Sequence, residues 1–117
     1  MMNAMKEIEK ALAVISENED LVGKVEWRNT NSTFASVSIE SKYGLLEAIL
    51  VVEVLESYDN KKAKYTVAKL NKRNREEGYY GEAESFTRWS AIRSLKRALE
   101  LGSRTGKLMA ERGLERK

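Results

Sequence analysis

The sequence predicts an α+β domain in which an N-terminal helix, an antiparallel β-meander of four to five strands and a C-terminal helix follow one another. Apolar residues recur at helical spacing near both ends of the chain and alternate with polar residues in between. The chain has 117 residues, of which 42% are hydrophobic, enough for one modest core. We therefore predict a single domain over residues 1–117, with the C-terminal helix packed on one sheet face.

Residues 4–16 are predicted to form the first helix. Met5, Ile8, Leu12 and Ile15 recur at steps of three and four residues, and charged residues occupy the other positions of the helical wheel. This spacing is typical of an amphipathic helix that buries one face.

A β-hairpin is predicted next. Val25 and Trp27 alternate with charged residues, as a half-buried strand requires. After the polar turn sequence NTNS, the residues Ala35, Val37 and Ile39 alternate in the same way. Two such strands separated by a short turn favour antiparallel pairing.

Residues 46–57 are nearly continuously apolar, so a helix and a fully buried strand both fit the pattern. The β-branched side chains of Ile49, Val51, Val52 and Val54 favour a central strand. The helix stays open as the alternative.

Residues 64–71 are predicted to form the next strand, with Tyr65 and Val67 on one face. Residues 78–85 are predicted to be its hairpin partner.

The last helix is predicted to start at Phe86 or Thr87, with Ser85 or Thr87 as the N-cap, and to stop at Gly102. Residues 103–117 are then a short helix or a loose basic tail. The predicted apolar face of the last helix consists of Trp89, Ala91, Ile92, Leu95, Ala98 and Leu99.

Composition argues against an enzyme. The chain has no histidine and no cysteine, so it lacks the commonest general base, the commonest metal ligand and any thiolate. Nucleophilic triads need a base of this kind, and no phosphate-binding or dinucleotide-binding glycine motif is present. We expect no catalytic residues, no metal site and no cofactor.

The N-terminal residues do not have the pattern of a targeting signal. Lys6, Glu7, Glu9 and Lys10 stand where a secretory signal needs its apolar segment. The longest apolar run, residues 48–52, is far too short to span a membrane. We expect a cytoplasmic, intracellular protein without a membrane partner.

Charge is distributed unevenly along the chain. Residues 1–60 contain 5 basic and 11 acidic residues, whereas residues 61–117 contain 16 basic and 7 acidic residues. Neutralisation of phosphates is the main sequence-independent term in nucleic-acid binding, so the basic half favours a polyanionic partner. The alternative is that the two halves neutralise one another, within one molecule or across an oligomer.

The candidate interface combines a basic hairpin tip, two tyrosines and the last helix. Neighbouring tyrosines on a strand face opposite sides, so at least one of them is expected on the outer surface. Cations that neutralise phosphates beside an exposed ring that stacks on a base are typical of single-strand binding. The predicted residues are Lys69, Lys72, Arg73, Arg75, Tyr79 and Tyr80 in the hairpin, and Arg88, Arg93, Lys96, Arg97, Arg104 and Lys107 in the last helix and tail.

The sequence therefore predicts a non-enzymatic protein that binds nucleic acid, with single-stranded DNA or RNA favoured. We also expect it to form a homo-oligomer. One alternative is a homo-oligomeric interaction protein of viral or plasmid type, whose basic half contacts a protein. The other is a metal-dependent enzyme that uses Glu82 and Glu84, which alternate onto one face of the last strand.

The run GYYGEAES followed by AIRSLKRALELGSRTGKL resembles the signature of the single-strand annealing proteins of homologous recombination and their phage relatives. The resemblance covers about 30 residues, with residues 78–81 and 96–99 at the matching positions. It implies a ring-forming or otherwise oligomeric protein that holds single-stranded DNA in a basic groove without a cofactor, with Lys96 and Arg97 contacting the backbone. The end of the chain is also similar to double-stranded RNA-binding domains, but Thr87-Arg88-Trp89 stands where those present a lysine pair.

Overall fold

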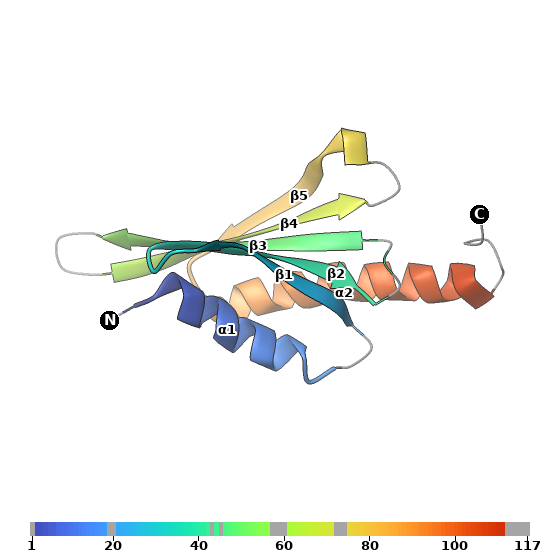
Figure 1. Cartoon of the computed structure of the whole chain (residues 1–117), viewed down its shortest axis with the longest axis horizontal. Coiled ribbons are helices and arrows are strands. Elements are labelled where there is room, and N and C mark those ends of the chain that lie inside the picture. The colour runs from blue at the N-terminus through green and yellow to red at the C-terminus, as the bar shows by residue number, and fades with distance from the viewer. Residues whose placement is uncertain are drawn as a thin grey trace.

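The computed structural model describes residues 2–18, 21–42, 44, 46–56, 61–71 and 75–111. Its five strands form one antiparallel sheet in chain order, and both helices lie on the same face of that sheet (Figure 1). The predicted α+β class is confirmed. The elements are α1 (Ala4–Ile15), β1 (Val22–Thr30), β2 (Phe34–Ser41), β3 (Leu46–Glu56), β4 (Lys61–Asn71), the short 3₁₀ helix η1 (Arg75–Glu77), β5 (Tyr79–Ser85) and α2 (Arg88–Glu111).

Helix α1 begins where the sequence predicts it. The side chain of Asn3 accepts a hydrogen bond from the backbone N–H of Lys6 at 3.2 Å and so caps the helix. Ala4, Ile8, Ala11 and Ile15 are completely buried in the core. The helical spacing of the apolar residues thus matches the buried face.

The segment that fitted both a helix and a strand is the central strand β3. Leu50 lies opposite Val37 of β2 and Val67 of β4, and all three are buried beneath the helices. On the other sheet face, Ile49 and Val51 are half-buried. Apolar residues on both faces explain why the sequence shows no alternation here.

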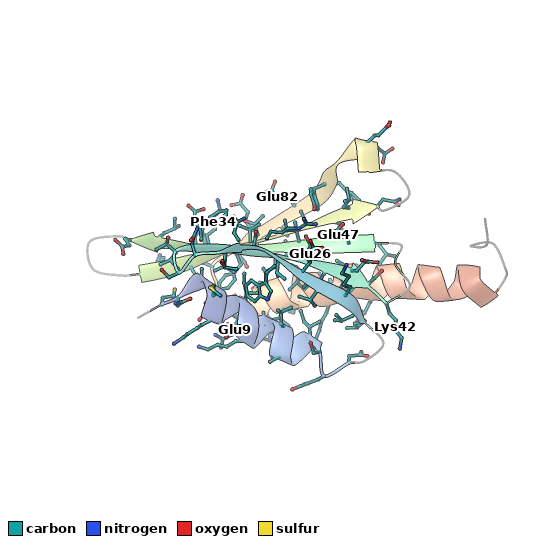
Figure 2. The ribbon with its side chains drawn as sticks, viewed as in Figure 1. Glu9, Glu26, Phe34, Lys42, Glu47 and Glu82 are labelled. Carbon is teal, nitrogen blue, oxygen red and sulfur yellow. The ribbon has the colours of Figure 1, made fainter. Side chains whose placement is uncertain are left out.

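The second face of the sheet is covered by neither α1 nor α2 (Figure 1) and is called the open face below. Phe34, Glu47 and Glu82 lie on this side, away from α1 and α2 (Figure 2). The strand register adds Glu40, Glu53 and Glu84 to the same face. The open face is therefore rich in carboxylates.

Helix α2 is longer than predicted. Thr87 is the N-cap, since its hydroxyl accepts a hydrogen bond from the N–H of Ser90 at 3.2 Å. The predicted stop at Gly102 is wrong, because the helix continues to Glu111. Gly102 is instead a packing position, where an added Cβ would lie 2.7 Å from the Cβ of Leu46 and 2.8 Å from the Oγ of Ser41.

Candidate nucleic-acid interface

Two of the predicted cations meet although they are far apart in the sequence. Lys69 of β4 and Arg97 of α2 line one surface groove with a volume of about 130 Å³. We call this the β4–α2 groove. Its remaining lining residues are Val67, Gly81, Ala83, Ser94 and Ala98.

Gly81 gives the groove its shape. Between the pairs Val67–Ala83 and Lys69–Tyr80, β5 contains one residue more than β4, which defines a β-bulge. Gly81 adopts a φ of +64°, a left-handed conformation that glycine reaches without steric cost. An added Cβ would lie only 2.6 Å from Cε of Lys69, so the lysine stem packs directly on the glycine.

The two tyrosines face opposite sides of the sheet, as expected for strand neighbours. Tyr80 pairs with Lys69, whose Nζ lies 5.4 Å from the centroid of the Tyr80 ring. Tyr79 pairs with Leu70, whose side chain belongs to the open face. Both rings are nearly half exposed, at 46% for Tyr80 and 47% for Tyr79. Only Tyr80 therefore adjoins the β4–α2 groove.

The outer face of α2 continues the positive charge. Arg93 and Arg97 are exposed one turn apart, and Lys96 is half-buried beside them. Within the part of the chain that the structure describes, neither these three residues nor Lys69 forms an ion pair with a carboxylate. Their charges remain available to an anionic ligand.

Arg88 does not join this surface. Its guanidinium lies 2.9 Å from Oε1 of Glu7, which also accepts a hydrogen bond from the hydroxyl of Tyr65 at 2.7 Å. Burial raises the pKa of Tyr65, and the Glu7 carboxylate raises it further. Arg88 therefore neutralises an acid of the N-terminal half, as the alternative interpretation of the charge pattern expected.

Five of the predicted cations fall outside the described residues or side chains. Lys72 and Arg73 lie outside the described residues. Arg75 belongs to η1, and Arg104 and Lys107 belong to the C-terminal turns of α2, but their side chains are outside the described part.

The prediction that Trp89 belongs to the buried face of the last helix is wrong. Its side chain is 66% exposed, and the neighbouring Phe86 is 60% exposed. The guanidinium of Arg93 lies over the Trp89 ring, 4.7 Å from its centroid. The signal was present in the sequence, because Trp89 is spaced four and eight residues from Arg93 and Arg97 and so lies on the basic stripe.

The carboxylates proposed for the alternative enzyme do share a face, because Glu82 and Glu84 flank Ala83, which pairs on the helix side with Val67. Glu84 forms a salt bridge with Lys64 at 3.2 Å. Among the described residues, no three acidic side chains come close enough together to hold a metal ion. No observation on these strands favours the enzyme.

A larger groove of about 510 Å³ lies between α1 and β1. Its described lining includes the apolar side chains of Met5, Leu12 and Trp27 and the carboxylate of Glu9, and none of the described lining residues is basic. Electrostatics therefore disfavour a phosphate in this groove, despite its greater size.

Comparison of the chain with protein-family models, with curated proteins and with solved structures finds no match. The resemblance to single-strand annealing proteins and the homo-oligomeric state both stay predictions. In the described ranges, no helix combines the length and the apolar character needed to cross a membrane.

Proposed function

We propose that this protein binds single-stranded nucleic acid without catalysis, with the β4–α2 groove and the Tyr80 ring at the centre of its interface. The observation that carries the proposal is the meeting of Lys69 and Arg97, from segments nearly 30 positions apart in the chain, beside an exposed aromatic ring. Cations together with a ring of this kind hold a strand by its phosphates and by one of its bases.

The size of the groove supports a strand rather than an enclosed small molecule. Pockets for drug-sized ligands and cofactors have volumes of roughly 300 to 1,000 Å³, whereas the β4–α2 groove has about 130 Å³. A groove this small accommodates a phosphate of a strand that passes over the surface. The bases then remain outside, where Tyr80 is exposed.

Fluorescence anisotropy with a labelled oligothymidylate of about a dozen nucleotides tests the proposal. Lys69→Ala and Arg97→Ala are expected to weaken binding about three- to tenfold each, since each removes one exposed phosphate contact. Lys24→Ala is the matched control, because Lys24 is an exposed cation of β1, the strand at the opposite edge of the sheet. Absence of binding at low salt, or equal effects of all three substitutions, would contradict the proposed interface.

The Tyr80 ring distinguishes single strands from duplexes. Tyr80→Ala is expected to weaken single-strand binding more than duplex binding, because paired bases cannot stack on a protein side chain. Tyr79→Ala is the control, since Tyr79 is equally exposed but lies on the open face. An equal loss for single strands and duplexes would argue that Tyr80 does not stack on a base.

A further inference from the structure

Two large aromatic side chains are exposed at the start of α2. Phe86 and Trp89 are 60% and 66% exposed, although aromatic side chains normally bury a large apolar area in cores and interfaces. Two exposed aromatic residues only three positions apart indicate a surface that contacts a partner.

The cations beside these rings indicate the chemistry of that partner. Arg93 lies over the Trp89 ring, and Arg97 follows one turn later at the β4–α2 groove. Trp89, Arg93 and Arg97 are spaced four residues apart and so form one stripe, which we call the Trp89 stripe. Arg93 at the ring and Arg97 one turn further along have no described carboxylate partner. A ring with such cations beside and beyond it suits an anionic ligand that also has flat, apolar faces. Nucleobases on a phosphate backbone have both properties.

We infer that Trp89 is a stacking platform for an unpaired base of the bound strand, whose phosphates follow Arg93 and Arg97 into the β4–α2 groove. The inference rests on the proposed function and extends its site by a second aromatic contact. Eight residues of helix separate Trp89 from Arg97, about 12 Å along the axis. This length spans at most three or four nucleotides, because the rise of about 3.4 Å per nucleotide belongs to a fully stacked strand and an unstacked strand is longer per nucleotide.

The geometry favours a single strand over a duplex. A side chain cannot stack on a base that is already stacked and paired within a helix, whereas unpaired bases turn outward readily. Stacking accepts any base, so the platform predicts little sequence preference.

Intrinsic fluorescence gives a direct test, because the chain contains only two tryptophans. In the Trp27→Phe variant, Trp89 is the sole tryptophan. Titration with an unlabelled oligothymidylate reports stacking by quenching of the Trp89 emission, and a parallel titration with a labelled oligothymidylate reports binding by anisotropy. We expect quenching by the single strand and none by a duplex of equal length. The Trp89 emission is also obtained without altering Trp27, which packs against the core. The spectrum of the Trp89→Phe variant is subtracted from that of the unmodified chain.

Affinity provides a second readout. Trp89→Ala is expected to weaken oligothymidylate binding roughly 5- to 150-fold, the range that corresponds to one stacked base. Trp89→Phe is expected to keep most of the affinity, because it retains a ring.

The outcomes separate this inference from the proposed function. Binding by anisotropy with unchanged Trp89 emission would overturn the stacking platform and leave the β4–α2 groove in place. No binding at all would overturn both. A third outcome would show that Phe86 and Trp89 contact a second copy of the chain. In that case the Trp89 emission changes with protein concentration alone, and sedimentation shows a dimer that Trp89→Ala abolishes. This outcome would overturn the inference.

Discussion

Glu7 of α1 forms hydrogen bonds with both the sheet and α2. It is buried in α1, accepts hydrogen bonds from Tyr65 of β4 and Arg88 of α2, and lies 3.6 Å from Lys10. Burial alone would raise the pKa of the Glu7 carboxyl, but the bonds from Tyr65 and Arg88 outweigh it and hold the pKa below the ordinary value of 4.5. The charged form of Glu7 therefore stabilises the fold.

Glu7→Gln tests this network through the pH dependence of stability. A depressed pKa in the folded state contributes stability that is complete above the unfolded pKa and is lost as the pH falls through the lower folded pKa. We expect the variant to lose roughly 1 to 3 kcal/mol of unfolding free energy at pH 7, with the difference shrinking below about pH 4.5. Urea unfolding of both proteins across this range is the measurement, and a constant difference would contradict the ionised network.

Gly81 and Gly78 form a matched pair, because both have positive φ values, +64° and +74°. Alanine at either position should cost about 1 to 2 kcal/mol of stability through backbone strain. Only at Gly81 would the new Cβ meet Lys69, since nothing lies within 4 Å of a Cβ at Gly78.

Gly81→Ala is therefore expected to weaken oligonucleotide binding as well as stability, whereas Gly78→Ala should lower stability alone. Thermal melts and anisotropy titrations of both variants provide the comparison. Equal affinities for the two variants would mean that the position of Lys69 does not matter.

At the residue scale, the sequence identifies which residues of the candidate interface are basic or aromatic. It does not show which residues these side chains contact in the fold. The exposed, basic character of Arg93 and Arg97 follows from helical spacing. The pairing of Arg88 with Glu7 joins residues 81 positions apart, so no local pattern could reveal it. The bulge at Gly81 likewise depends on the register between two strands.

Among the elements, α2 is where prediction and structure differ most. Glycine is a poor helix former, so Gly102 resembles a stop signal. Tertiary packing overrides that preference, because the missing side chain lets α2 approach Ser41 and Leu46 closely. Strand β3 is the opposite case, since its β-branched residues gave the right prediction despite the absence of alternation.

Gly102→Ala tests this packing. Alanine should improve helix propensity by about 1 kcal/mol, but overpacking against buried neighbours costs roughly 1 to 3 kcal/mol. The buried Ser41 cannot easily move, because its Oγ accepts a hydrogen bond from the N–H of Leu46 at 3.2 Å. We therefore expect a net loss of up to about 2 kcal/mol in urea unfolding.

Glu100→Ala, at an exposed position of the same helix, should change stability by less than about 0.5 kcal/mol. A Gly102→Ala variant more stable than the unmodified chain would show that helix propensity dominates at this position.

For the whole molecule, the two faces of the sheet differ in charge. The open face carries the carboxylates of Glu40, Glu47, Glu53, Glu82 and Glu84, by register and by position. The cations of the proposed interface, Lys69, Arg93 and Arg97, lie on β4 and on the outer side of α2. The open face also carries basic residues, since Lys24 pairs with Glu40, Lys64 pairs with Glu53 and Arg28 forms a salt bridge with Glu47. The sequence predicted an imbalance between the two halves of the chain, and the fold brings carboxylates from both halves together on the open face. A nucleic acid should therefore follow α2 and avoid the open face.

The central claim is that Lys69 and Arg97 act together on the phosphates of one strand. The most direct measurement is the slope of log affinity against log salt concentration for an oligothymidylate, from about 50 to 200 mM salt. Each phosphate that the protein neutralises releases counterions and contributes about 0.7 to this slope for single strands, so the Lys69→Ala/Arg97→Ala double variant should have a slope shallower by roughly 1.4. A double variant whose slope equals that of the unmodified protein would contradict the account.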